Sequence, residues 1–515
     1  MRLKQTVALL VLAVALPARP AGREAAWVSL DAAGKLLYRT LPRGDRIVDF
    51  SYAGYMGGGV ALPRAAVMRT VAPSGGDDTA VIQRAIDEVS ALPLKDGLRG
   101  AVLLGPGTFA CSAPLNIGAS VVVLRGSGAG ATTLELTGDP HAAIAIDGKE
   151  QAKKLGAAAH IAQAYVPSGA QAISLDDASA FAAGDTIHIT RSTTPQWLQF
   201  MGMDRMVRDG KPERWVGNRI VTTRRVAARQ GNLLTLDVPV TDSYDRAFLP
   251  PAGAEVAKVE VNGGIEQVGV ESLRIAAPAR TIPLSDPLFR AMTVHGLRDG
   301  WVRDLAIDET TEGIDLAEDT SRITVEDVAV RHTTAITSSA EPADFALRGG
   351  QLLLLRCSSV GDEEFYVITG ARNQGPNVVL DSTFRGNGHV QPHQRWATGL
   401  LVDNVHVPGG GIDLMNRGQM GTGHGWTMGW GVVWNSSAAT LLIQNPPGAA
   451  NWSIGTSGEE TKSAMKIVGV HPRDEGPPLP QGYIESQGHA VTPASLYRAQ
   501  LAERLGAGAL KALEP

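Results

Sequence analysis

The stretch ITVEDVAV at residues 323–330 decides the fold, because its pattern recurs along the chain. Apolar residues lead to one small or polar residue, and an alternation of apolar and polar residues follows. The same pattern is found in VGVESLRI (268–275), WVRDLAI (301–307), LLLRCSSV (353–360), NVVLDSTF (377–384), LLVDNVHV (400–407) and VVWNSSA (432–438). Each segment reads as a short strand with one unusual position near its centre.

The spacing of these segments indicates how the strands stack. We align them on Ser272, Asp304, Asp327, Cys357, Ser382, Asn404 and Asn435, which lie 22 to 32 residues apart. Self-similar strands at this period, without helices between them, are typical of a β-solenoid whose coils bury their apolar side chains by stacking. An antiparallel β-sandwich is the alternative, but it needs tight hairpin turns, and their signals are sparse here. We interpret Asn404 and Asn435 as structural ladder residues.

A candidate helix near the N-terminus is expected to cover the exposed core at one end of the solenoid, and a second helix near the C-terminus is expected to pack on the outside of the solenoid. Residues 78–90 predict an amphipathic helix with Asp78 as N-cap and Val81, Ala85 and Val89 on one face, joined by two isoleucines. Residues 493–505 predict a second helix, preceded by a threonine cap and ended by glycine. Residues 160–250 interrupt the repeats and predict an inserted β-rich subdomain that leans over the solenoid.

The N-terminus and the composition limit the location and the class of partner. Residues 1–22 combine two basic residues with a short apolar run, which predicts a secretory signal peptide and export to the periplasm or beyond. No later segment is long and apolar enough to predict stable insertion in a membrane. The net charge of −5 has no basic bias, so nucleic acid is not an expected partner. Cys111 and Cys357 are predicted to be buried free thiols.

Several motifs carry a resemblance to a known group of proteins. GDDTAVIQRAID (76–87), GAVLLGPGTF (100–109) and VVVLRGSG (121–128) resemble the start of the pectate-lyase-like superfamily. Five further stretches resemble a poorly characterised bacterial branch of exported proteins in that superfamily. They are DFSYAGYMGGGVALP (49–63), GARNQGPNVVLD (370–381), PHQRWATGLLVDNV (392–405), NRGQMGTGHGW (416–426) and QNPPGAANWSIG (444–455). Gln394 departs from that branch, which has a second histidine there. The superfamily includes polysaccharide lyases, glycoside hydrolases, uronate epimerases and phage tailspikes, so fold does not settle function.

The resemblance implies an all-β fold, a right-handed parallel β-helix. We therefore expect a signal peptide at residues 1–22, an N-terminal segment at 23–64, the β-helix with its insertion at 65–460, and a C-terminal tail at 461–515. A long solenoid presents its stacked strands as a groove suited to an extended polymer. We expect the partner to be a polysaccharide substrate, and the sequence gives no oligomeric state.

A dense group of charged and aromatic residues at 393–426 is the predicted site. Cleavage of a uronic acid polymer by β-elimination needs a cation or calcium at the carboxylate, a base and a proton donor. We predict His393, Arg395, His424 and Arg417 as catalytic residues. We predict substrate binding by Asn416, Trp396, Trp426, Tyr366 and Arg372, the two indoles by stacking on sugar rings.

Two alternatives to the lyase remain open. A glycoside hydrolase needs paired carboxylates, for which residues 362–364 and Asp304, Asp308 and Glu309 are candidates. A glycan-binding β-helix without catalysis would keep aromatic contacts and need no acid or base. No cofactor is required, and calcium bridging of carboxylates is a hypothesis for either enzyme. We interpret His332 as a structural histidine.

Overall fold

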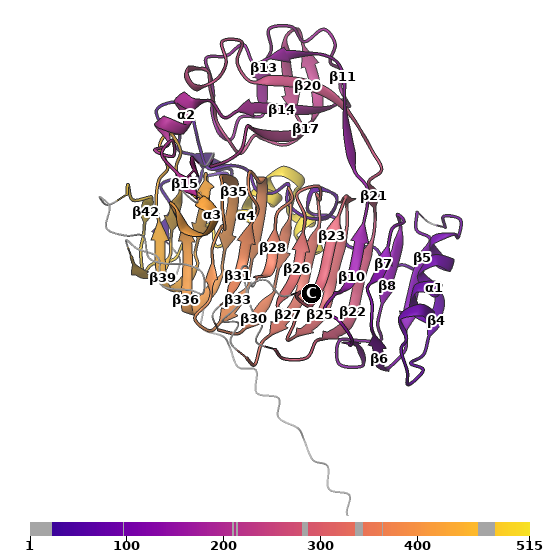
Figure 1. Cartoon of the computed structure of the whole chain (residues 1–515). Helices are drawn as coiled ribbons and strands as arrows, with labels where there is room; N and C mark the ends of the chain where they lie inside the picture. Colours follow the sequence, from indigo (N-terminus) through magenta and orange to yellow (C-terminus); the bar gives the residue numbers. More distant parts are fainter. Residues whose placement is uncertain are drawn as a thin grey trace, which may run out of the picture.

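Three columns of parallel strands form the body of the protein in this computed structural model (Figure 1), which describes residues 23–95, 97–208, 211–212, 215–280, 287–334, 343–362, 364–461 and 479–514. The first column runs through β4 (Val67–Val71), β5 (Gly100–Leu104), β8 (Val122–Arg125), β22 (Gly269–Ala276), β25 (Trp301–Asp308), β27 (Thr324–Arg331), β29 (Leu353–Leu355), β32 (Gln374–Leu380), β35 (Ala397–Asp403), β38 (Val432–Trp434), β40 (Trp452–Ile454) and β42 (Tyr483–Glu485), with β37 (Met428–Gly429) beside β35.

The second and third columns complete each coil. The second contains β6 (Gly107–Cys111), β9 (Thr132–Leu136), the later halves of β22, β25 and β27, then β30 (Ser358–Val360), β33 (Thr383–Arg385), β36 (His406–Leu414), β39 (Ser437–Ile443) and β41 (Ser457–Glu460). The third contains β7 (Leu115–Ile117), β10 (Ala142–Asp147), β23 (Arg290–His295), β26 (Glu312–Leu316), β28 (Ala343–Leu347), β31 (Phe365–Thr369) and β34 (His389–Val390). The prediction of an all-β, right-handed parallel β-helix is confirmed.

The residues on which the sequence segments were aligned mark the bend between the first and second columns. Ser272, Asp304, Asp327, Asn404 and Asn435 adopt left-handed backbone conformations, with φ between 46° and 55°. In two coils the left-handed residue comes one position before the aligned one, at Arg356 and Asp381. Small or polar residues tolerate this conformation best, so the bend imposes the recurring sequence position.

The helix α1 (Thr79–Ser90) covers the N-terminal end of the solenoid, as predicted. Ala85 and Val89 are buried in the main core, but Val81 is 41% exposed and lies outside the apolar face. The Asp78 side chain makes no cap hydrogen bond and accepts one from the Ser74 backbone N–H instead. Asp78 is therefore the N-cap residue, as predicted, but its side chain does not cap the helix. The Asp77 carboxylate accepts from the first backbone N–H of the helix, that of Thr79.

The C-terminal helix α4 (Leu496–Leu505) packs on the outside of the first column. Ser495, rather than the predicted threonine, caps it by accepting from the Arg498 backbone N–H, and Gly506 follows the last turn. Together with residues 25–53, α4 covers the outward apolar side chains of the first column, including Trp434 and Trp452. Short elements complete this part: β1 (Arg23–Glu24), β2 (Val28–Leu30), β3 (Leu36–Tyr38), β43 (Val491–Thr492) and the 3₁₀ turns η1 (Tyr55–Gly57) and η3 (Ala507–Leu513).

An inserted subdomain leaves the solenoid between β10 and β22 and stands over one of its corners (Figure 1). Its six-stranded antiparallel sheet has the order β11 (Gln151–His160), β20 (Glu255–Asn262), β14 (Thr186–Ser192), β17 (Arg219–Gln230), β18 (Leu233–Leu236), β13 (Ala172–Ser174). Smaller elements are β12 (Tyr165–Val166), α2 (Pro195–Phe200), β15 (Val207–Arg208), β16 (Lys211–Pro212), β19 (Tyr244–Asp245) and η2 (Arg246–Phe248), with β21 (Ile265–Glu266) and β24 (Leu297–Arg298) at the base and α3 (Met420–Gly423) in a solenoid loop.

The predictions for the termini and for the cysteines have different outcomes. The predicted signal peptide at residues 1–22 lies outside the described residues. Among the described helices, none has the length and apolar character needed to cross a membrane. Both cysteines are buried free thiols. Burial raises the pKa of the Cys111 thiol to about 12 and that of Cys357 further still.

Candidate functional site

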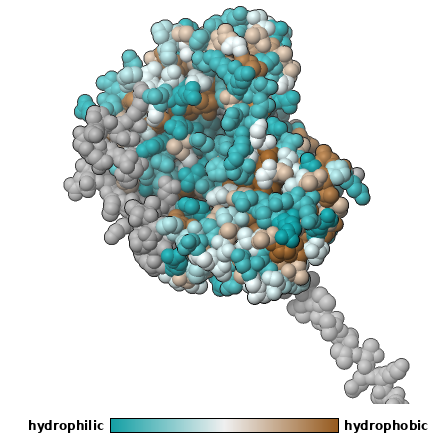
Figure 2. Space-filling view, turned by 45° about the vertical axis from the view of Figure 1, so that its right-hand side comes forward, coloured by the Kyte–Doolittle hydropathy of each residue, from teal (hydrophilic) through white to brown (hydrophobic). Residues whose placement is uncertain are grey.

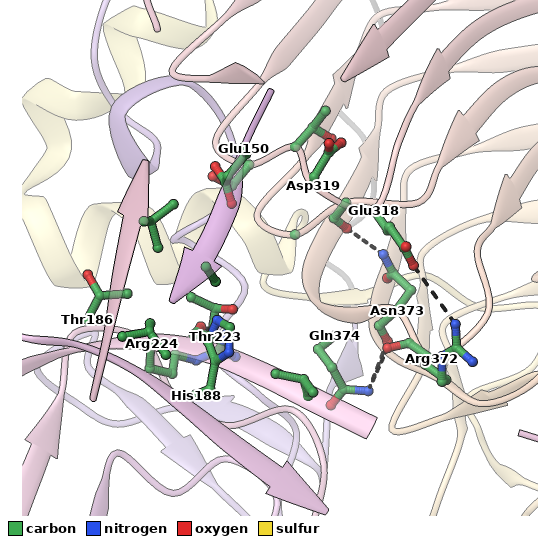
Figure 3. A pocket seen from close by; sticks show the side chains of 18 of the residues that line it. Glu150, Thr186, His188, Thr223, Arg224, Glu318, Asp319, Arg372, Asn373 and Gln374 are labelled. Carbon is green, nitrogen blue, oxygen red and sulfur yellow. Dashed lines mark hydrogen bonds and ion pairs between the residues drawn. The ribbon is translucent and has the colours of Figure 1, made fainter. Parts of the chain in front are cut away.

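A cleft lies between the inserted subdomain and the corner of the solenoid that joins the third column to the first (Figure 3). Its cavity volume is about 950 Å³. The space-filling view shows mainly hydrophilic residues where the two parts face one another (Figure 2). A volume of this size suits a segment of a polymer, and side chains reach it from both the inserted sheet and the solenoid.

The inserted wall of the cleft is the face of the antiparallel sheet opposite its own core. On β14, Ile187 and Ile189 are buried in the subdomain core, so Thr186, His188 and Thr190 project to the other face and line the cleft. His188 pairs in register with Thr223 on one side and Ala257 on the other. These smaller neighbours leave the imidazole accessible at the middle of the sheet face.

The solenoid wall is built from loops that follow β26, β28 and β31. They contribute Glu318, Asp319, Arg322, Arg348, Arg372, Asn373 and Gln374. The same corner of successive coils supplies these side chains, and the parallel stacking places them in a row. Arg372 Nη2 lies 4.0 Å from Glu318 Oε2, and Arg348 Nε donates to Asp315 Oδ1 at 2.9 Å.

The two walls are held in place by buried polar contacts. The Arg224 guanidinium on β17 donates to the Val238 and Pro239 carbonyls of the subdomain and to the Gly375 carbonyl of the solenoid, at 2.9 to 3.1 Å for the closest bond to each. Beside it, Thr222 Oγ1 donates to Gln374 Oε1 at 3.2 Å. Since buried hydrogen bonds of this kind resist separation, the cleft is preformed.

The electrostatics of the cleft combine an excess of arginine with two perturbed groups. Burial, and then the positive charge of Arg219, lowers the pKa of His188 below its usual range, so the imidazole is neutral near pH 7. Burial and the nearby Asp319 carboxylate raise the pKa of Glu150. Among the residues that the structure describes, the lining includes no phenylalanine, tyrosine or tryptophan. Recognition in this cleft therefore depends on charge and hydrogen bonds rather than on ring stacking.

The structure brings most of the predicted 393–426 group together, but beneath the inserted subdomain. Arg417 Nη1 lies 3.1 Å from His393 Nδ1 and donates to the His393 carbonyl at 2.9 Å, and the rings of His393 and His424 are 4.7 Å apart. The Arg395 backbone N–H donates to the His424 carbonyl at 2.9 Å. The backbones of Asn416 and Trp426 pair in an isolated antiparallel β-bridge.

Burial separates this group from the cleft. His393, Arg417, His424 and Asn416 are between 2% and 6% exposed, and none of them lines the cleft. Burial and the Arg417 charge lower the pKa of both histidines, that of His424 to about 3, so both rings are neutral. A base must reach the proton that it removes, so we assign the proposed chemistry to the cleft instead.

The predicted stacking of Trp396 and Trp426 on sugar rings does not fit the structure. Both indoles are 2% exposed and pack with Trp197 and Trp215 of the subdomain in one apolar cluster. Trp396 Nε1 donates to Asp242 Oδ2 at 2.9 Å, and Trp426 Nε1 donates to the Met201 carbonyl at 3.1 Å. The two side chains anchor the subdomain to the solenoid, so no ring face remains for a sugar.

Tyr366 and Arg372, both predicted to bind substrate, lie in different surroundings, and of the two only Arg372 reaches the cleft. Tyr366 is fully buried in the solenoid, where its hydroxyl donates to the Gly361 carbonyl and accepts from the Gly388 N–H, so the structure contradicts substrate binding by it. Arg372 is placed in the cleft. Its guanidinium reaches across to the subdomain, where a Cβ at Gly217 would lie 3.1 Å from Nη1.

Three of the carboxylates predicted for a hydrolase, Asp304, Asp308 and Glu309, have structural roles. Asp304 forms the bend of its coil, Asp308 Oδ1 lies 3.1 Å from Arg331 Nε, and Glu309 accepts from the Thr333 N–H. Of residues 362–364, Glu363 lies outside the described residues and Glu364 is buried at the opposite end of β31 from the cleft. Within the described chain, the group that can hold a metal ion lies at that opposite corner too.

Sequence reasoning missed His188, Arg219, Glu150 and the acidic pair at residues 318–319. The sequence held a signal for one of them. In TIHIT (186–190) apolar and polar residues alternate, which places His188 on the face opposite the two buried isoleucines. Nothing local indicates that this face would meet the loops after β26, β28 and β31. That contact depends on the packing of the insertion.

Comparisons with known proteins give weak similarities of structure. No family model matches the chain, and no curated protein matches it. The tailspike of E. coli bacteriophage HK620 is 12% identical with a TM-score of 0.41, over 91% of this chain and 69% of that one. The A-module of the Azotobacter vinelandii mannuronan C-5 epimerase AlgE4 is 12% identical with a TM-score of 0.33, over 86% and 96%. The Gp54 tailspike of Acinetobacter baumannii bacteriophage AP22 is 10% identical with a TM-score of 0.28, over 79% and 71%.

Proposed function

We propose that this protein is an exported, polysaccharide-active enzyme that cleaves a uronic-acid-containing polymer by β-elimination in the cleft. The observation that carries the proposal is the composition of the cleft: arginines approach from both walls, and the described lining residues include no phenylalanine, tyrosine or tryptophan. A neutral glycan offers such a surface only hydroxyl groups. A uronate adds one carboxylate per residue, which arginine binds by charge-assisted hydrogen bonds.

The proposed chemistry uses one group for each requirement of the elimination. Arg219 and Arg372 bind the substrate carboxylate and reduce its negative charge, which acidifies the neighbouring C5–H bond. The neutral His188 imidazole removes the C5 proton, and the electron pair forms the C4–C5 double bond as the C4–O bond breaks. Glu150, whose raised pKa favours the protonated form, gives its proton to the leaving oxygen.

Hydrolysis is a second candidate because of the acidic end of the cleft. Burial and then the nearby Asp319 carboxylate raise the pKa of Glu150, and glycoside hydrolysis uses a pair of carboxyl groups in which one acts as the acid. Asp319 Oδ1 is buried without a hydrogen-bond partner, although His295 Nδ1 lies 3.7 Å away. In this alternative Glu150 protonates the leaving oxygen, and Asp319 activates water or attacks the sugar.

The test is a screen of the purified chain against uronate-containing and neutral polysaccharides. The ultraviolet absorbance of unsaturated uronates and the number of reducing ends are measured together. Both signals rise in an elimination, whereas hydrolysis raises reducing ends alone and would contradict the lyase proposal. Binding without either signal would identify a glycan-binding protein and contradict catalysis.

Variants of the cleft locate the activity. We expect Arg372→Ala to weaken polymer binding by about 10- to 100-fold, the loss of one charge-assisted contact. His188→Ala should abolish product formation and leave binding within about twofold. The matched controls are Arg229→Ala, an exposed arginine of β17 outside the cleft, and His160→Ala on β11. If both cleft variants behave like these controls, the cleft is not the site.

A further inference from the structure

A buried cluster of His332, Asp344 and Glu364 lies at the corner that joins the second column to the third. His332 follows β27, Asp344 is in β28 of the same coil, and Glu364 precedes β31 of the next coil. The cleft lies at the opposite ends of β28 and β31 from this cluster. Along the chain, Asp344 of the cluster and Arg348 of the cleft are four residues apart. At about 3.3 Å per residue the two positions are separated by roughly 13 Å.

The cluster holds its polar atoms in an arrangement that hydrogen bonds do not satisfy. His332 Nε2 lies 2.8 Å from Asp344 Oδ1 and 2.9 Å from Glu364 Oε2. One ring nitrogen can direct a single N–H toward only one of these oxygens. Within the described residues, Asp344 Oδ2 is buried without a hydrogen-bond partner, and Glu364 Oε2 competes with Asp344 Oδ1 for the same His332 nitrogen; the two carboxylate side chains are each 1% exposed. Unsatisfied buried carboxylate oxygens are costly, so they need an additional positive partner.

We propose that His332, Asp344 and Glu364 bind one divalent metal ion of the zinc class, which joins two successive coils at this corner. One candidate ligand atom from each residue lies within 4.8 Å of the others. Zinc–ligand bonds of about 2.0–2.1 Å in a tetrahedron place ligand atoms about 3.3 Å apart. The distance from His332 Nε2 to each carboxylate oxygen, now 2.8 and 2.9 Å, must therefore increase by about 0.5 Å when the ion binds.

The ligand types favour zinc over calcium. Calcium takes six to eight oxygen ligands, whereas imidazole suits zinc and related transition metals. A divalent ion at this point places a positive charge between the two buried carboxylates.

Two structural features permit the ion to enter and remain. A cavity of about 190 Å³, lined in part by His332, Thr333 and Gly361, gives access beside the imidazole. Gly361 lets the backbone approach the ligands, since a Cβ there would lie 2.4 Å from Glu364 Oε1 and 3.0 Å from His332 Cδ2. Three protein ligands leave a fourth position, which water can take from this cavity.

The test measures metal in the purified full-length protein. After chelation, dialysis against Zn²⁺ and removal of excess metal, elemental analysis should find about one zinc per chain. The isosteric variants Asp344→Asn and Glu364→Gln should each bind zinc at least about 100-fold more weakly, a larger loss than removal of an outer-shell partner causes. Zinc should raise the unfolding temperature of the wild type and not that of the variants.

The matched control is Asp413→Asn. Asp413 Oδ2 lies 2.5 Å from His389 Nδ1 in an equally buried histidine–carboxylate pair without a second carboxylate contact from His389. This variant should retain one zinc. X-ray absorption of the zinc-loaded wild type, which depends on no variant, should report nitrogen and oxygen ligands. Absence of stoichiometric zinc in the wild type, retention of zinc by both ligand variants, an all-oxygen first shell, or displacement of zinc by equimolar calcium would each overturn the proposal.

Discussion

Replacing Trp396 by phenylalanine distinguishes an anchoring role from a sugar-binding role. The indole Nε1 donates to Asp242 Oδ2 at 2.9 Å, and this carboxylate is 1% exposed. Phenylalanine removes the donor but keeps edge-to-face contacts of the kind that Trp396 makes with Trp197 and Trp215, whose ring centroids are 5.8 and 6.1 Å away. Arg191 still pairs with Asp242 at 2.7 Å, so the carboxylate does not become an unpaired charge.

The expected cost is that of one buried hydrogen bond to a charged group, about 2 to 3 kcal/mol. If the inserted subdomain opens as a unit, its most protected amides should exchange about 30- to 150-fold faster, because about 1.4 kcal/mol corresponds to a factor of ten. Hydrogen–deuterium exchange read by mass spectrometry measures this separately for peptides of β14, β17 and β20. Polymer binding to the folded fraction should change little.

Trp430→Phe is the matched control. Trp430 is 1% exposed, but its Nε1 has no hydrogen-bond partner, and it packs in the cluster under α4 rather than under the subdomain. This variant should leave exchange in the subdomain unchanged. The anchoring argument would fail if Trp396→Phe left subdomain exchange at the wild-type rate while polymer binding fell about tenfold, the behaviour of a stacking residue.

Two predictions concern pH. Burial and then Arg219 lower the pKa of His188, so kcat/KM on the polymer should fall only below pH 6.5. Arg219→Gln removes the nearby positive charge and should move this acidic limb of the pH profile to higher pH. A limb that stays in place would exclude His188 as the titrating base. Burial and then Arg417 lower the pKa of His424 to about 3 in the folded protein. As the pH falls, this histidine is therefore protonated in the unfolded chain before it is protonated in the folded chain. Between pH 6.5 and about 3, stability should therefore fall as pH falls, by about 1.4 kcal/mol per unit from this residue. Denaturant unfolding at several pH values should show a smaller slope in His424→Gln, and an equal slope in both proteins would contradict the assignment.

The solenoid could be predicted because each coil repeats the same local problem. The left-handed bend at positions such as Asp304 and Asn404 requires a tolerant residue once per coil, and apolar strands flank it every time. The period is therefore written into the sequence. Coils in which the bend falls at Arg356 or Asp381 shift the alignment by one residue, since a neighbouring cysteine or serine fits the expected pattern better than the residue that actually bends.

The site could not be predicted in the same way, because its walls share no repeat. His188 belongs to a sheet that is inserted once, and Arg372 belongs to a solenoid corner some 180 residues later in the chain. Their proximity depends on buried contacts such as Arg224 with the Gly375 carbonyl. A sequence pattern reports which side chains share an element, whereas a site between two units depends on how those units dock.

The dense PHQRW segment shows why residue type alone misleads at such a junction. An indole with a buried carboxylate partner and a histidine beside an arginine are features of sugar sites, and they are equally features of a polar interface between folding units. The two cases differ in exposure, which is 2% for Trp396 and 3% for His393. The same junction nevertheless serves the proposed function indirectly. By fixing the inserted sheet over the solenoid corner, it holds Arg219 and His188 opposite Arg372. Loosening the junction should therefore raise the fraction of molecules with an open subdomain, while the folded fraction binds the polymer as before.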